Sequence, residues 1–227
     1  SQMLIWFAKT SAGGGWEDPF KNYARNIGAL DICSLDLSSI DAGTELELVA
    51  YVYMKKPTMK KGTLLRLLVD NKEQIDTQGR NQIEGDGEEH RIAWDLTPFV
   101  GKKVSLRFET AMRTKNDAII LAYYQIIPKT KHPDVSLAWV NHPAIETKVN
   151  MREEVVRFKV RNNSSQELHN VPIAVLVDGA LSYSETLETL KPFEDRVITH
   201  THDFTSAVAH KYSVEVRVAA EGDHNPD

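Results

Sequence analysis

The 227-residue sequence has little cysteine, no long apolar run and no strong excess of one charge, and each shortage excludes a class of protein. Cys33 is the only cysteine, so no disulfide can form within the chain. No segment approaches the roughly 18 consecutive apolar residues that cross a bilayer as a helix. Because 27 Lys and Arg residues stand against 32 Asp and Glu residues, nothing suggests a basic surface for nucleic acid. We therefore expect no nucleic-acid partner and no membrane span.

The chain does contain enough apolar residues, 41%, for a folded core, and its length allows one large domain or two small ones. It begins Ser1-Gln2-Met3, without an initiator methionine or a leader, and its last residues, 222–227, are typical of a linker. We therefore expect a piece of a longer protein, with further domains of the same parent chain as neighbours.

Short segments in which apolar and polar residues alternate predict an all-β chain. Leu46, Leu48 and Ala50 share one face of a strand over 45–53, since successive side chains of a strand point to opposite faces. Comparable strands are expected at 64–69, 91–95, 104–110, 118–127, 135–139, 154–161, 171–177, 196–200 and 212–218. Residues 17–30 are the best candidate for a short helix.

A polar segment with two prolines at 128–133 predicts a domain boundary. It separates a first domain, 1–128, from a linker, 129–133, and a second domain, 134–227. The second domain has short strands separated by turn residues, which favours an immunoglobulin-like sandwich. It lacks the cysteine pair of antibody domains, so the fibronectin type III-like form is expected.

Three short motifs mark the second domain: Asp-Val-Ser-Leu at 134–137, Arg-Asn-Asn at 161–163 and Val-Pro-Ile at 171–173. With these motifs, residues 134–227 resemble the bacterial cell-adhesion-related CARDB domain, a fibronectin-like sandwich. The resemblance implies a spacer or adhesive module of a secreted or cell-surface protein, often beside a catalytic domain.

The first domain contains Leu-Asp-Leu-Ser-Ser at 35–39 and a stretch over 94–108 in which Gly101-Lys102 precedes a strand ending in Arg-Phe. These segments resemble the jelly-roll modules of the cleaved-adhesin and choice-of-anchor type, which are similar to MAM domains. The aspartate that this family places before its last strand, often for calcium, is absent from 121–126. Calcium therefore has no supporting ligand motif, and we expect no cofactor. The predicted fold is two β-sandwiches in series, jelly-roll-like and then immunoglobulin- or fibronectin III-like.

The best indication of ligand binding comes just after a glycine-rich turn in the first domain. Trp16, Phe20 and Tyr23 lie close together in the sequence, with Glu17 and Asp18 between them. Sugars stack their apolar ring faces on aromatic side chains, while acidic groups take the hydroxyls. We predict a glycan site at these five residues. The alternative is that Trp16 and Phe20 close the end of the sandwich core, because large aromatic residues are mostly buried.

A metal-like pattern occurs at His200 and His202, which share a face if the segment is a strand. Two imidazoles could hold zinc together, although a closed site needs about four ligands. Asp203, His210 or a distant group would have to supply the rest, and Asp203 would point to the opposite face. The alternative is a polar strand face in contact with solvent.

The sequence has no Gly-x-Ser-x-Gly elbow, His-Glu-x-x-His helix or phosphate-binding loop. A hydrolase would have to build its site from residues such as His90 and Asp95. We therefore predict a non-catalytic region of an exported bacterial protein, secreted or at the cell surface, that spaces or presents a binding surface. Its partner would be a glycan or a host or cell-surface protein. The alternative is an accessory region of a secreted peptidase or other hydrolase, with no ligand of its own.

Overall fold

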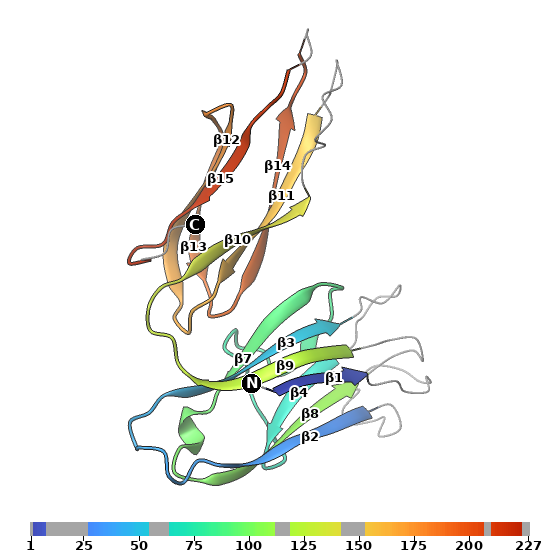
Figure 1. Ribbon diagram of the computed structural model, residues 1–227, viewed down its shortest axis with the longest axis vertical. Helices are drawn as coiled ribbons and strands as arrows, with labels where there is room; N and C mark the ends of the chain where they lie inside the picture. Colours follow the sequence, from blue (N-terminus) through green and yellow to red (C-terminus); the bar gives the residue numbers. More distant parts are fainter. Residues whose placement is uncertain are drawn as a thin grey trace. The chain divides into compact units, whose positions relative to one another are not determined.

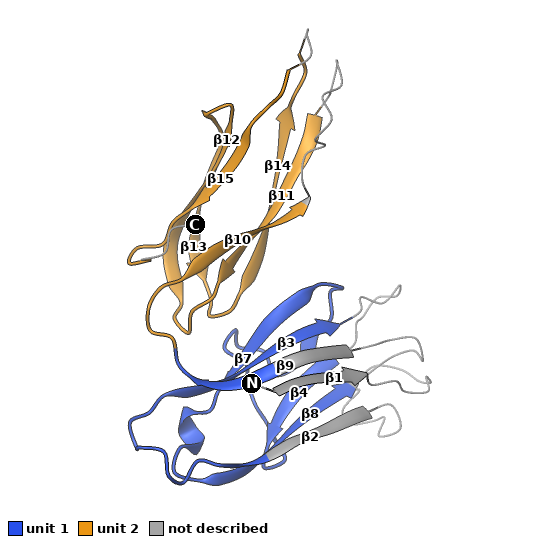
Figure 2. Cartoon of the chain, viewed as in Figure 1, with its two compact units in different colours: residues 1–129 blue, residues 130–227 orange. Residues whose placement is uncertain are grey.

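A computed structural model describes residues 2–7, 27–54, 64–111, 119–141, 153–206 and 210–223. The chain divides into two compact units, residues 1–129 and 130–227 (Figure 2). Over the described ranges the strands form four antiparallel sheets, two in each unit, so the all-β prediction is confirmed (Figure 1). The described part contains no helix long and apolar enough to span a membrane.

Unit 1 consists of two sheets with the strand orders β1-β9-β3-β7 and β2-β8-β4-β5, and β6 also pairs with β4. A short 3-10 helix, Thr97–Phe99, comes after β7. The strands are β1 (Gln2–Phe7), β2 (Ile27–Asp36), β3 (Leu46–Met54), β4 (Leu64–Val69), β5 (Lys72–Glu73), β6 (Ile83–Glu84), β7 (Glu89–Asp95), β8 (Lys103–Ala111) and β9 (Ile119–Pro128).

The pairing shows that unit 1 is one long hairpin wrapped around a core. β1 pairs with β9, β2 with β8, β3 with β7 and β4 with β5, and successive pairs alternate between the two sheets. The hairpin reverses at Asp70 and Asn71, whose φ angles of 49° and 62° give the two-residue turn that matches the twist of paired strands. Asp70 Oδ1 also accepts the Ser105 backbone N–H at 2.8 Å, which joins the turn to β8. This wrapped hairpin is the predicted jelly roll.

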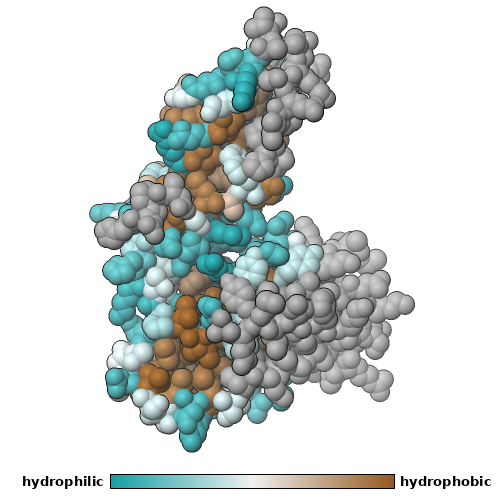
Figure 3. All heavy atoms as spheres, viewed as in Figure 1, coloured by the Kyte–Doolittle hydropathy of each residue, from teal (hydrophilic) through white to brown (hydrophobic). Residues whose placement is uncertain are grey.

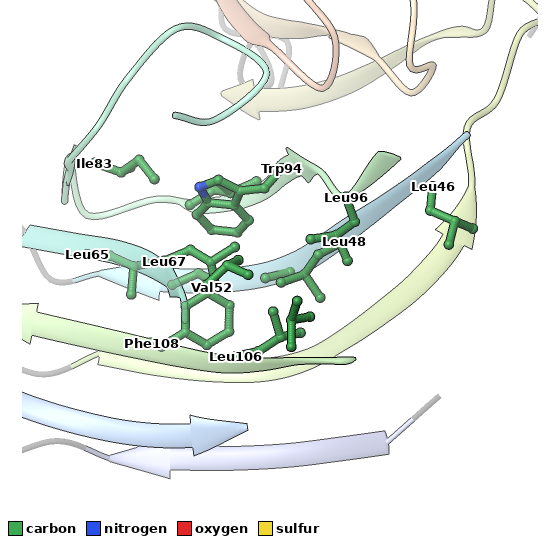
Figure 4. Close-up of a cluster of buried hydrophobic side chains, with 14 of the residues drawn as sticks. Leu46, Leu48, Val52, Leu65, Leu67, Ile83, Trp94, Leu96, Leu106 and Phe108 are labelled. Carbon is green, nitrogen blue, oxygen red and sulfur yellow. The ribbon is translucent and has the colours of Figure 1, made fainter. Parts of the chain in front are cut away.

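The core of unit 1 lies between its two sheets and is built from alternate residues of the central strands. The predicted inward face of β3 is buried, with Leu48 and Ala50 fully covered. The rings of Trp94 on β7 and Phe108 on β8 meet across the core, with centroids 5.5 Å apart (Figure 4). Both side chains are fully buried, so each sheet covers the apolar face of the other.

The expected helix over 17–30 is wrong where the structure can test it, because residues 27–30 begin β2. β2 pairs with β8 along its length, from Ile27 opposite Ala111 to Asp36 opposite Lys103. These ladder hydrogen bonds outweigh a weak local helical pattern. Residues 17–26 lie outside the described part of the chain.

Unit 2 is a smaller sandwich of two three-stranded sheets, β10-β11-β14 and β13-β12-β15. Its first, second and fifth strands share one sheet, and its third, fourth and sixth share the other, as immunoglobulin-like connections require. The strands are β10 (Val135–Asn141), β11 (Glu153–Asn162), β12 (Leu168–Val177), β13 (Ala180–Leu190), β14 (Asp195–Asp203) and β15 (Val214–Val218). Its separate core centres on Phe158, Val156 and Val175.

The side chain of Asn162, at the end of β11, joins two turns of unit 2. Its Nδ2 donates to the carbonyl oxygens of Gln166, Leu190 and Lys191 at 2.6, 3.0 and 3.0 Å. Its Oδ1 accepts from the backbone N–H and the hydroxyl of Ser164. Asn162 is only 2% exposed, and its bonds to Leu190 and Ser164 are buried. The asparagine of the Arg-Asn-Asn motif is therefore structural.

The first and last described segments of unit 2 lie side by side. The backbone N–H of Val135, at the start of β10, donates to Asp223 Oδ2 at 3.3 Å. Gly222 has a φ angle of 82°, and a β-carbon on it would lie 3.6 Å from Pro133 Cγ. Residues 133–135 and 222–223 therefore lie at the same end of this sandwich.

Two matched core variants test whether each unit has a core of its own. Phe108→Ala and Phe158→Ala each remove a ring from a fully buried position and leave a cavity, which costs about 3–5 kcal/mol of unfolding free energy. We expect calorimetry to show that each variant lowers mainly the transition of its own unit. Equal shifts of every transition in both variants would show a shared folding unit instead.

Asn162→Ala removes both N–H donors of a buried amide and leaves the three carbonyls of two turns without them. Urea unfolding should show that the free energy of unfolding of unit 2 falls by roughly 3 kcal/mol, because each buried polar group left unsatisfied costs about 1–3 kcal/mol. Asn163→Ala, which changes a partly exposed neighbour, is the control. A loss as large in the control would contradict this role for Asn162.

Candidate functional site

Trp16, Glu17, Asp18, Phe20 and Tyr23 lie outside the described residues, so the glycan site remains a prediction. The site that the structure describes in most detail is the pair of histidines in unit 2.

His200 and His202 lie on β14, opposite Val156 and Glu154 of β11. Val156 is buried in the core, so the two histidines face the space between the sheets rather than open solvent. Both rings reach one hydroxyl: Ser182 Oγ lies 2.8 Å from Nε2 of His200 and 2.7 Å from Nδ1 of His202. Two imidazole nitrogens therefore converge on a single atom.

A β-bulge in β13 places this hydroxyl. Val175 of β12 lies opposite Tyr183, but the next residue, Leu176, lies opposite Leu181, so Ser182 is an extra residue in the strand. A bulge of one residue reverses the faces to which the neighbouring side chains of the strand point. Leu181 is consequently 66% exposed, while Ser182 turns toward the histidines. Sequence reasoning missed Ser182 because alternation alone would place it on the outer face.

A row of rings holds both histidines in place. The ring of Tyr183 stacks on His200 with centroids 5.0 Å apart, and His202 meets Phe204 edge-on at 4.6 Å. The row continues from Phe204 to Tyr212 at 5.0 Å. Partial burial, and then the proximity of His202, lower the pKa of His200. This lowered pKa favours the neutral form of the His200 imidazole.

The additional ligands that the sequence suggested have other partners. Asp203 Oδ1 accepts the Thr205 backbone N–H at 2.9 Å, and His210 Nε2 lies 2.7 Å from Asp178 Oδ2. Hydrogen bonds from the Ser213 backbone and from His210 lower the pKa of Asp178, and the electrostatic effect of His202 adds to them. Among the described residues, no group of three or more His, Cys, Asp or Glu side chains could hold a metal ion. Zinc binding at His200 and His202 remains a prediction.

The outer face of the β13-β12-β15 sheet carries a groove of about 710 Å³. Its floor is Pro172 and Ala174 on the central strand, opposite Thr186 and Ser184 of β13. The opposite wall includes Glu215 and Arg217 of β15, joined by a hydrogen bond between Arg217 Nε and Glu215 Oε1. The small side chains of the central strand lie between larger side chains of β13 and β15. The groove therefore has an apolar floor and polar walls.

Large apolar side chains also reach the surface. The space-filling view shows apolar areas among polar ones on the visible face of both units (Figure 3). Ile75, Trp139, Leu181 and Val197 are the exposed large apolar residues in the described part, and Leu181 borders the groove.

The two residues suggested for a hydrolase site do not come together. His90 and Asp95 lie five positions apart on the regular strand β7, so their side chains point to opposite faces. His90 Nε2 lies 2.7 Å from Asp86 Oδ2. Burial raises the pKa of Asp95, but bonds from Thr97 and the ammonium of Lys129 outweigh it and hold that pKa low. The Asp95 carboxylate is therefore ionised and binds Thr97 and Lys129.

No protein-family model and no curated protein matches the chain, so the resemblances to CARDB and to cleaved-adhesin modules remain predictions. Among solved structures, the exo-chitosanase CsxA of Amycolatopsis orientalis is 15% identical, with a TM-score of 0.29, over 87% of this chain and 24% of that one. A calcium-binding mutant of Bacteroides uniformis β-glucuronidase 2 is 12% identical, with a TM-score of 0.30, over 98% and 27% of the two chains. The chain thus spans about a quarter of the length of these proteins.

Ser182→Ala tests the hydroxyl that links the histidines. We expect a loss of about 1–3 kcal/mol in the unfolding free energy of unit 2, because two partly buried ring nitrogens lose their partner. Ser184→Ala, on the outer face of the same strand, should change stability by less than about 0.5 kcal/mol. Equal effects in chemical unfolding would show that the bulge hydroxyl has no special role.

Proposed function

We propose that the chain is a non-catalytic part of an exported bacterial protein and that it presents a binding surface rather than adding length. The observation that carries this proposal is the side-by-side arrangement of residues 133–135 and 222–223 in unit 2. A sandwich entered and left at opposite ends would add the length of a strand, about 30 Å for nine residues at roughly 3.3 Å each. A sandwich entered and left at one end adds little length and instead displays its far end.

Separate cores support this role. The buried cluster of unit 1 and that of unit 2 have no described residue in common, so each unit has the means to stay folded by itself. Independent folding lets a module hold a surface in a fixed shape without help from its neighbours. The separate cores and the arrangement of unit 2 support the presentation of a surface. The exported location is supported by the resemblance of residues 134–227 to the CARDB domain.

We propose a glycan as the ligand, bound through Trp16 and its neighbours as predicted from the sequence. The groove of unit 2 is the competing location, because hydroxyls and charges border its apolar floor. The groove residues include no aromatic side chain for stacking against a sugar ring, which favours the Trp16 segment.

A broad glycan array with the whole chain tests the proposal. Saturable binding should be abolished in Trp16→Ala and kept in Trp139→Ala, a control that removes another tryptophan, 40% exposed. Ala174→Trp fills the floor of the groove, and loss of binding in that variant alone would move the site to unit 2. Absence of binding to every glycan would favour the alternative, an accessory region of a secreted peptidase or other hydrolase with no ligand of its own.

A further inference from the structure

Strand β15, Val214–Val218, is the last strand of its sheet, so one of its edges has no further strand beside it among the described residues. The backbone N–H of Asp178 donates to the Ser213 carbonyl at 2.8 Å, so residue 213 faces β12. In a regular antiparallel pair every second residue makes such bonds, and the register of β12 and β15 is regular. The backbones of Glu215 and Arg217 therefore face β12, and those of the three valines face the open edge.

The other three outer strands of unit 2 carry features that discourage pairing with a further strand. The register of β10 shifts between Trp139 and Asn141, and β13 contains the bulge described above. On β14, His200 and His202 point inward. Irregular strands and inward-pointing polar groups protect exposed edges in this way. β15 has neither, and its five residues include no proline or lysine, so its edge is a template for another strand.

The sequence of β15, Val-Glu-Val-Arg-Val, matches a second copy of itself. When two copies pair antiparallel about a two-fold axis at Val216, Glu215 of each copy lies opposite Arg217 of the other. These positions are the closely spaced ones, with Cα atoms about 4.5 Å apart, and opposite charges there stabilise the pair. Shifting the axis by one residue would place Glu215 opposite Glu215 or Arg217 opposite Arg217, which is unfavourable. The charges thus select one register.

The same register satisfies the open edge. Val216 lies opposite Val216, and Val214 lies opposite Val218, so their N–H and C=O groups meet in about six hydrogen bonds. The three valines pack against the core of unit 2 but remain partly exposed. The valines of the second copy would lie beside them and remove more apolar surface from water.

We propose that two copies of the chain associate through β15, so that their three-stranded sheets join into one sheet with the order β13-β12-β15-β15-β12-β13. Five residues of each copy make the strand contact, which is at the small end of specific interfaces. The dimer therefore forms reversibly and its population depends on concentration. It does not involve the glycan site proposed above.

Sedimentation velocity of the whole chain over a range of concentrations tests the dimer, whose fraction should rise with concentration. Glu215→Arg should weaken it by roughly tenfold, because two attractive cross-strand pairs become repulsive. Adding Arg217→Glu to that variant should restore the dimer, since opposite charges again face each other. Both side chains are half exposed or more, so neither change disturbs the core. Glu188→Arg, the same charge change at an exposed position of β13, should have no effect.

Val216→Cys tests the position of the two-fold axis. Residues that face each other there have Cα atoms about 5.5 Å apart, within the range of a disulfide. With Cys33, the only cysteine of the chain, replaced by serine, mild oxidation should link Val216→Cys into a covalent dimer. Val197→Cys, at a position 41% exposed on β14, is the control and should form a covalent dimer much more slowly.

Three results would overturn the proposal. The first is a monomer at every concentration of the unaltered chain, which would leave the edge of β15 to a strand of a different protein. The second is a dimer that Glu215→Arg does not weaken or that the double charge reversal does not restore. The third is equal crosslinking at residues 216 and 197.

Discussion

A β-sheet that is apolar on one face is stable in water only when that face is covered, and this requirement shapes both units. In unit 1 the wrapped hairpin meets it, because each pair of hydrogen-bonded strands is succeeded by a pair in the facing sheet. Trp94 and Phe108 show how the two faces cover each other, because they come from different sheets, their rings are in contact and both are fully buried. The Asp70–Asn71 turn joins β4 to β5 at the tip of this hairpin.

In unit 2 the inner faces of the sheets are largely apolar except at the end where the histidines lie. Ile198 of β14 is buried in the core, and the next two residues on the same face of this strand are His200 and His202. Two imidazoles thus stand where aliphatic side chains would be expected. A polar group between sheets needs a partner, and the bulge in β13 provides one in the hydroxyl of Ser182. A single inserted residue thus produces an exposed Leu181 beside the groove and a polar cluster within the sandwich.

Most strands could be predicted from alternation, because their inward faces are regular. β4 was predicted with its observed bounds, and β3 to within one residue at each end. β13 was missed, since Ser, Thr and Glu dominate it and few of its residues are buried. β2 was missed because its residues pair with residues of β8 that lie 67 to 84 positions further along the chain, and pairing at that distance leaves no local pattern.

For the candidate site, the sequence predicted that His200 and His202 would share a face, because that depends only on strand periodicity. It could not identify Ser182 or Phe204 as their neighbours. Ser182 depends on a bulge, and Phe204 lies just past the end of β14, where strand periodicity no longer applies. Contacts between strands depend on register, which is set by the whole sheet rather than by any short segment.

The pairing of β1 with β9 determines how unit 1 would respond to a pulling force. Gln2 lies opposite Tyr124, close to where β9 ends at Pro128 and the chain continues into unit 2. Tension applied between these neighbouring ends acts across the strands, so it loads the ladder hydrogen bonds one after another instead of all together. Unit 1 would therefore open strand by strand at low force instead of resisting until all the bonds between β1 and β9 break together.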